Sequence, residues 1–151
     1  MSYQSWHEYG YGICVDDIET TVDKVLELVH LAPEFENKFV KWIESYKEYD
    51  NVENIDMGDV YEGYEDDYCC ELGLGPIIRA VISECENIEL LCCSNYNEQQ
   101  YLIFNVTYPW YMSDKEKNMT EEDVRLVISK YVNMLTDKNI IIEYQSVENG
   151  G

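Results

Sequence analysis

The sequence predicts an α+β fold, in which a four-stranded antiparallel sheet carries helices on one face. Several segments place apolar residues at three- and four-residue steps, which is typical of amphipathic helices. Short β-prone runs separate these segments. Once extra helices are set aside, the order is β-α-β-β-α-β, as in ferredoxin-like folds. The 151 residues fit a single domain, residues 1–151.

The N-terminal region is predicted to form a strand followed by a helix. The second half of the aromatic segment Trp6–Val15 indicates a strand, and Gly10 and Gly12 indicate a bulge or a close backbone approach. Asp16 and Glu19 have the spacing of a capping box. The first helix is therefore expected to begin at Asp16.

The remaining elements follow from apolar stripes and turn signals. Pro33 is predicted to start a second helix, and Thr120 is predicted to cap the last helix, with Asp123 three residues on. A third helix and a β-hairpin lie between these two, and one strand closes the fold. The expected ranges are 76–87 for the third helix, 88–93 and 101–106 for the hairpin strands, and 139–144 for the last strand, with 149–151 as a loose tail.

The segment Glu44–Gly75, called the acidic segment below, is the most unusual part of the chain. It contains eleven carboxylates, five tyrosines and one lysine, so it holds −10 of the chain's net charge of −21. Its glycines make one long helix improbable, although a short helix around 59–64 is compatible with them. We expect an insertion in the first crossover, outside the minimal core, where loops commonly carry binding.

The net charge excludes two classes of partner. A strongly negative surface repels phosphate backbones and anionic membranes, so neither direct nucleic-acid binding nor membrane binding is expected. The chain shows no apolar run of about twenty residues and no basic-then-apolar leader. The sequence therefore predicts a cytoplasmic protein.

Signals for catalysis, cofactors or metals are weak. Motifs for nucleotide binding, zinc proteases and hydrolases are missing. An EF-hand calcium loop that begins at Asp50 is also ruled out, because Ile55 stands where the loop needs glycine and Tyr61 stands where it needs a bidentate acid. The six cysteines have no CxxC spacing and read as reduced thiols, with a redox role for Cys69–Cys70 left open. We expect no enzyme activity and no cofactor, with opportunistic divalent-ion binding by crowded carboxylates left open.

The acidic segment favours docking against a basic protein. A solvated face would also be acidic, but solubility does not require the five tyrosines. Tyrosine offers a rigid contact area with a polar tip, and carboxylates steer a partner and pair with its Lys and Arg residues. The candidate partner-binding residues are Glu53, Asp56, Asp59, Tyr61, Glu62, Tyr64, Glu65, Asp66, Asp67 and Tyr68.

In composition, mainly over Glu44–Glu71, the chain resembles small acidic phage-encoded inhibitors of the anti-CRISPR type. That resemblance implies a non-enzymatic inhibitor that mimics nucleic acid and binds a basic protein such as a nuclease or a Cas effector. An immunity protein that neutralises a nuclease toxin would use the same physics.

Another alternative is a regulatory domain that binds a small ligand or a metal. In that case the aromatic residues Trp6, Tyr9, Tyr11, Trp110 and Tyr111 would line a pocket at the sheet edge. A homo-oligomer interface also stays open, on a face other than the acidic segment because two such segments repel each other.

Overall fold

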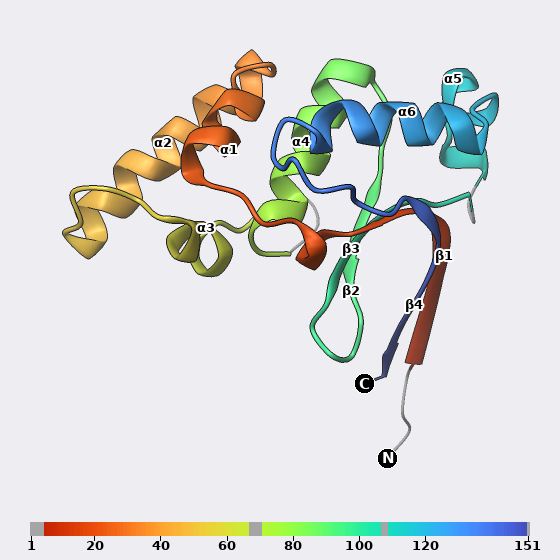
Figure 1. The fold of residues 1–151 in the computed structure, drawn as a ribbon, viewed down its shortest axis with the longest axis horizontal. Coiled ribbons are helices and arrows are strands. Elements are labelled where there is room, and N and C mark those ends of the chain that lie inside the picture. The colour runs from red at the N-terminus through yellow and green to blue at the C-terminus, as the bar shows by residue number, and fades with distance from the viewer. Residues whose placement is uncertain (1–4, 67–70, 107–108, 151) are drawn as a thin grey trace.

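The computed structural model describes residues 5–66, 71–106 and 109–150. Its centre is a four-stranded sheet in the order β2-β3-β1-β4, and all neighbouring strands are antiparallel (Figure 1). Six α-helices lie in the described part of the chain, so the predicted α+β class with an antiparallel sheet is confirmed. The strands are β1 (Ser5–Cys14), β2 (Leu91–Ser94), β3 (Gln100–Phe104) and β4 (Glu143–Gly150).

The helices pack mainly over one face of this sheet, where α4 contacts β2 and β3 and α6 contacts β1 (Figure 1). The α-helices are α1 (Val22–Val29), α2 (Pro33–Asp50), α3 (Met57–Gly63), α4 (Leu74–Glu86), α5 (Asp114–Lys117) and α6 (Glu121–Val132). Two short 3-10 helices are η1 (Val15–Asp17) and η2 (Pro109–Tyr111). None of the helices in the described ranges combines the length and the apolar character that crossing a bilayer requires.

The predicted start of the first helix is wrong. Asp16 lies in η1, and the cap of α1 is Thr21, whose hydroxyl accepts a hydrogen bond from the Lys24 N–H at 3.4 Å. By contrast, Thr120 and Asp123 form the predicted capping box of α6, and Pro33 is at the start of α2 as expected. The carboxylates of Asp16 and Glu19 therefore do not cap α1.

The predicted last strand is displaced. β4 begins at Glu143 and includes Asn149, which was expected in a loose tail. The apolar residues Ile140 and Ile142 that suggested a strand instead pack against the helical core from the connection before β4. β4 itself is mostly polar, and Val147 is the only one of its described side chains that is fully buried. Its place in the sheet comes from backbone pairing with β1.

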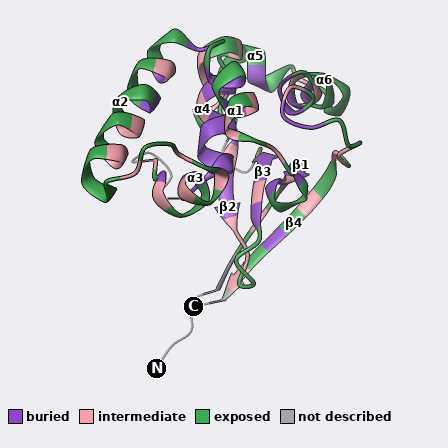
Figure 2. Cartoon of the chain, turned by 60° about the vertical axis from the view of Figure 1, so that its left-hand side comes forward, coloured by how far each residue is buried: buried purple, intermediate pink, exposed green. Residues whose placement is uncertain are grey.

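The main core lies between the sheet and the helices, with α4 at its centre (Figure 2). Apolar side chains from α1, α2, α4 and α6 meet Tyr11, Ile13, Leu102 and Phe104 of the sheet there. The acidic segment takes part in this core, because Val60 of α3 is fully buried in it. The segment is thus not outside the core as the sequence suggested.

The opposite face of the sheet is curled around a second, small core of Cys93, Ile103 and Val147. Two hydrogen bonds hold the curl closed between the outer strands: Tyr96 N–H donates to the Glu148 carbonyl at 3.1 Å, and the Asn149 amide donates to the Ser94 carbonyl at 3.0 Å.

The curl depends on glycine in β1. A Cβ atom at Gly12 would lie 1.9 Å from the Leu102 carbonyl oxygen, and one at Gly10 would lie 2.6 Å from the Phe104 carbonyl oxygen. These two positions are the close backbone approach that the sequence predicted.

Candidate functional site

The acidic segment does not form one continuous docking face. Its first part is the end of α2, where Tyr49 is 90% exposed, and its middle forms α3 beneath α2 (Figure 1). The short helix expected around 59–64 is therefore present as α3. Glu53 and Glu62 are exposed, as docking would require. The predicted residues Asp67 and Tyr68, and the pair Cys69–Cys70, lie outside the described residues.

Asp56 and Asp59 hold α3 in place. Their side chains form a reciprocal capping box, with both hydrogen bonds at 2.9 Å. Asp59 also accepts a hydrogen bond from the Tyr46 hydroxyl at 2.8 Å. The bonds from the Asp56 N–H and from Tyr46 lower the pKa of Asp59, and the Asp59 carboxylate raises the pKa of Tyr46 to about 12. Asp56 remains exposed, whereas Asp59 is half-buried.

Tyr64 was expected to be an exposed anchor, and that expectation is wrong. The side chain is only 7% exposed and belongs to the main core. It stands edge-on to the rings of Phe35, Phe39 and Trp42, with ring centroids 5.3 to 6.1 Å apart. The aromatic stripe of α2 and this edge-to-face geometry stabilise the inward orientation.

Asp66 was expected to act as a phosphate surrogate, but its carboxylate is engaged within the fold. It pairs with the Arg79 guanidinium at 3.2 Å, and both side chains are nearly buried. Arg79 also pairs with Glu89 at 3.0 Å. Glu65, the neighbouring candidate, is exposed and pairs with Leu72 in an isolated β-bridge. The Asp66 carboxylate is therefore held in a nearly buried ion pair with Arg79.

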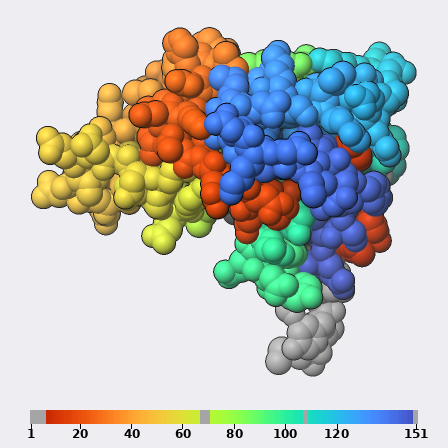
Figure 3. Space-filling model, viewed as in Figure 1, coloured from red at the N-terminus to blue at the C-terminus, as the bar shows by residue number. Residues whose placement is uncertain are grey.

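Tyr61 lines a better-defined site, an acidic cleft of about 770 Å³ between η1, α3 and the β2–β3 hairpin. The space-filling view shows the surface indented between α3 and this hairpin (Figure 3). The cleft is lined by Val15, Asp16, Ile18, Glu19, Tyr61, Glu71, Leu72, Leu74, Ser94, Glu98 and Gln100.

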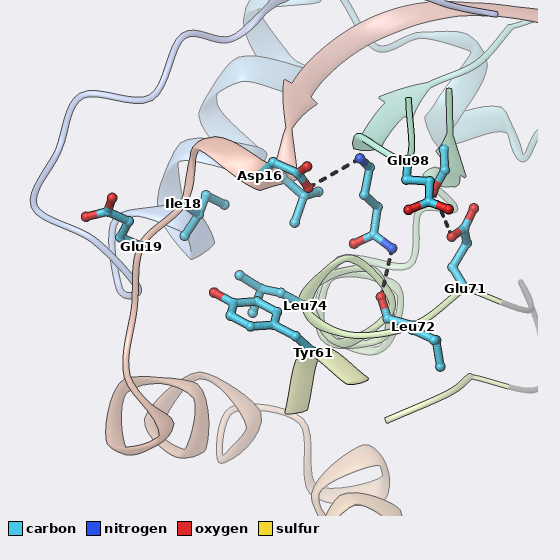
Figure 4. A pocket seen from close by; sticks show the side chains of 11 residues that line it. Asp16, Ile18, Glu19, Tyr61, Glu71, Leu72, Leu74 and Glu98 are labelled. Atoms are coloured by element: carbon cyan, nitrogen blue, oxygen red, sulfur yellow. Dashed lines mark hydrogen bonds between the residues drawn. The ribbon is translucent and has the colours of Figure 1, made fainter. Parts of the chain in front are cut away.

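Four carboxylates surround an apolar floor in this cleft (Figure 4). Asp16 and Glu19 come from the connection after β1, Glu71 precedes α4, and Glu98 lies in the hairpin turn. None of the described residues that line the cleft is a lysine or an arginine. At the rim, Glu19 forms an exposed ion pair with Lys138 at 3.0 Å. The other three carboxylates are therefore the main source of negative potential in the cleft.

Gln100 fixes the walls of the cleft relative to one another. Its buried side chain accepts a hydrogen bond from the Gly75 N–H and donates one to the Leu72 carbonyl, both at 2.8 Å. Its backbone N–H donates to Asp16 at 3.3 Å (Figure 4). On the far wall, the Ser94 hydroxyl donates to Glu71 at 2.9 Å. The cleft is thus held by β3 and the start of α4.

Tyr61 supplies a neutral hydroxyl beside these charges. Its side chain is 43% exposed. Partial burial raises its pKa, and the nearby carboxylates of Asp16 and Glu19 raise it further. The group therefore stays protonated at neutral pH. Carboxylates around an apolar and aromatic floor suit a guanidinium or ammonium group on an aliphatic stem.

Substituting Gln100 with methionine is expected to lower the free energy of unfolding by about 1–3 kcal/mol. The thioether has similar length but leaves the buried Gly75 N–H and Leu72 carbonyl without their partner. Chemical denaturation of both proteins measures the loss. Gln99→Met is the matched control, because Gln99 is exposed and should change stability by less than about 0.5 kcal/mol. Equal losses in the two variants would contradict this role for Gln100.

Reasoning from the sequence missed Glu98, Gln100 and the site role of Asp16 and Glu19. The spacing of Asp16 and Glu19 was interpreted as a helix cap, and Glu98 lies between the two predicted hairpin strands. The backbone of Glu98 has φ of 64°, a left-handed conformation that glycine or asparagine adopts at lower cost. No local signal in the sequence distinguishes this turn position.

The predicted aromatic pocket is not formed as a unit. Tyr9 and Tyr11 line a hollow of about 170 Å³, whereas Tyr111 lines a different one. Trp110 and Tyr111 are highly exposed and lie against each other, with ring centroids 6.0 Å apart. The side chain of Trp6 is outside the described part of the structure.

The described cysteines and acidic residues offer little for redox or metal chemistry. Burial raises the pKa of Cys93 to about 12 and also raises the pKa values of Cys14 and Cys85, which keeps these thiols protonated. Among the residues that the structure describes, no group of three His, Cys, Asp or Glu side chains is arranged to hold a metal ion.

A scan against protein-family models, a search of curated proteins and a search of solved structures each gave no significant match to this chain.

Proposed function

We propose that this protein is a non-enzymatic inhibitor that binds a basic, nucleic-acid-handling protein by acidic mimicry of nucleic acid, in the manner of anti-CRISPR proteins. The observation that carries the proposal is the acidic cleft, in which four carboxylates surround an apolar floor on a chain of net charge −21. A partner that binds phosphates presents arginine and lysine side chains in the complementary arrangement.

The cleft supplies both halves of such a contact. The stem of an arginine or lysine would pack on Ile18, Tyr61 and Leu74, while its charged end would reach the carboxylates at the rim. Charge-assisted hydrogen bonds to carboxylates are about twice as strong as neutral ones. Glu98 also has a left-handed backbone conformation, and strained positions of this kind cluster at functional sites.

The remaining acidic residues would act at longer range. Glu53, Asp56, Glu62 and Glu65 are exposed and add to the negative field on the α3 side of the molecule. Such a field raises the rate of encounter with a cationic partner, and salt weakens it. In this proposal Tyr61 is the aromatic contact, and Tyr64 and Asp66 support the fold.

The same surface would serve an immunity protein that covers the active site of a nuclease toxin, so the partner alone separates the two versions. We place this encounter in the cytoplasm.

We also infer that the connectivity belongs to the ferredoxin-like class. The support is the strand order β2-β3-β1-β4, with antiparallel neighbours throughout and helices in both crossovers.

The proposal is tested by measuring binding and inhibition against a panel of purified nucleases and Cas effectors. We expect at least one member to bind, to lose nucleic-acid binding in competition, and to be released by moderate salt. Binding that nucleic acid does not compete away would contradict mimicry, and so would the absence of any binding across the panel. A rise in melting temperature with Ca²⁺ or metabolites, without any with basic proteins, would favour the regulatory-domain alternative.

A further inference from the structure

β4 is an edge strand whose outer side is open in its first half. It pairs with β1 alone, in a regular register from Gly12↔Glu143 to Ser5↔Gly150. The Glu148 carbonyl accepts a hydrogen bond from Tyr96, which is not in β1, so the backbone groups of Glu148 point away from β1. In an antiparallel pair, the backbone N–H and C=O groups of every second residue point to the same side of the strand. The N–H and C=O groups of Tyr144 and Ser146 therefore also point outward.

Within the described ranges, no other strand lies along β4 at Tyr144 and Ser146. Edge strands are commonly protected by lysine, proline or a bulge. The sequence of β4, EYQSVENG, contains neither lysine nor proline, its register has no bulge, and its two charged residues, Glu143 and Glu148, lie outside the stretch from Tyr144 to Ser146. This edge can accept another strand.

A hollow of about 170 Å³ lies beside this edge, on the face that carries the Tyr144 side chain. Its walls include Tyr9, Phe104 and Val124, and the Tyr9 and Tyr144 rings are stacked with centroids 6.5 Å apart. Tyr144 is 62% exposed. An apolar cavity of about 150 Å³ binds benzene, so this hollow can take one phenylalanine- or leucine-sized side chain.

We propose that the edge of β4 binds an extended, cationic segment of another protein by strand addition, with one large apolar side chain of that segment in the adjacent hollow. Strand addition gains affinity from main-chain hydrogen bonds and specificity from side-chain pockets. This surface is separate from the acidic cleft, and the inference holds whether or not the cleft has the proposed function.

Charge decides the kind of occupant. β4 carries Glu143 and Glu148, β1 carries Glu8, and neither strand contains lysine or arginine. Glu121 is the charged residue that lines the hollow. The Arg125 guanidinium that contacts Tyr11 there is paired with Glu122. A second copy of this chain would add its own Glu143 and Glu148 to the same ribbon, and like charges on paired strands are destabilising. A segment rich in lysine relieves this repulsion.

The probe for this surface is the peptide acetyl-Lys-Thr-Lys-Phe-Lys-Thr-Lys-amide, titrated into the ¹⁵N-labelled full chain. Saturation is expected to slow hydrogen exchange of the Tyr144 and Ser146 amides about tenfold or more. The same peptide with every backbone amide N-methylated keeps its charges and its phenylalanine but has no backbone N–H to donate, so it should bind at least about tenfold more weakly. Replacing its phenylalanine with glycine should also weaken binding about tenfold or more.

A matched pair of protein variants completes the test. Ser146→Pro removes the outward N–H, and Ser146→Ala keeps it, while both lose the hydrogen bond between the Ser146 hydroxyl and His7. We expect Ser146→Pro alone to weaken binding. Equal binding of the native and N-methylated peptides, or unchanged exchange at both amides, would overturn the proposal, as would no binding at millimolar peptide. Slowed exchange of these amides by self-association would assign the edge to a second copy and overturn it too.

Discussion

Replacing Arg79 with methionine is expected to lower the free energy of unfolding by about 3–5 kcal/mol. Arg79 is a buried residue of α4 that pairs with Asp66 at 3.2 Å and with Glu89 at 3.0 Å. Methionine fills much of the same space but removes the guanidinium that pairs with the Asp66 carboxylate, whose side chain is only 11% exposed. The cost of that buried charge exceeds the loss of the attraction itself.

Urea denaturation of the variant and the native protein measures this effect. Lys138→Met is the control, because the Lys138–Glu19 pair is well exposed and should contribute less than about 1 kcal/mol. The double variant Arg79→Met with Asp66→Asn should regain part of the loss, since the carboxylate is neutralised. A loss below about 1 kcal/mol in Arg79→Met would show that Asp66 finds water or another partner, and Asp66 would again be a candidate for docking.

Substituting Gly12 with alanine is expected to have a similarly large effect, about 3 kcal/mol or more. The added Cβ would lie 1.9 Å from the Leu102 carbonyl oxygen and 2.8 Å from the Ile103 Cα. Both contacts are backbone atoms of β3, so no side-chain movement can relieve them. The strands must separate, and the hydrogen bonds at that point of the sheet weaken.

The melting temperature and the urea midpoint of Gly12→Ala test this prediction. Gly58→Ala is the matched control, because the nearest atom to its Cβ is the Asp56 side-chain oxygen at 3.1 Å and alanine favours the helix. We expect Gly58→Ala to change stability by less than about 1 kcal/mol. If Gly12→Ala is as stable as the control, the close approach of β1 and β3 does not limit the fold.

Local patterns were sufficient for the helices that face the core. The stripes of α2, α4 and α6 and the Thr120 cap all follow from residues within one or two turns of each other. β4 was placed too early because its position depends on pairing with β1, more than 130 residues away in the chain. Its polar sequence has no strand signal of its own.

The site was predicted less well, for a related reason. The acidic segment contributes Tyr61 and Glu71 to the cleft, but alternation of charge and tyrosine does not reveal which side chains turn inward. Tyr64 turns in because the aromatic stripe of α2 lies above it, and Asp66 turns in because Arg79 is there. The cleft itself joins Asp16, Glu71 and Glu98, which only the folding of β1 beside the hairpin brings together.

The most direct test of the cleft compares two variants of equal charge. The first replaces Asp16, Glu71 and Glu98 with Asn, Gln and Gln, which keep oxygen acceptors for the hydrogen bonds from Gln100 and Ser94. The second replaces three exposed glutamates elsewhere, Glu27, Glu44 and Glu48, with glutamine. Both variants carry a net charge of about −18.

Affinity for whichever basic protein the panel yields is then measured by calorimetry at several salt concentrations. We predict that the cleft variant binds at least about 100-fold more weakly, because desolvated charge pairs are lost, and that the control variant binds within about fivefold of the native protein. Equal weakening of the two variants would mean that the overall negative field, and not the acidic cleft, holds the partner.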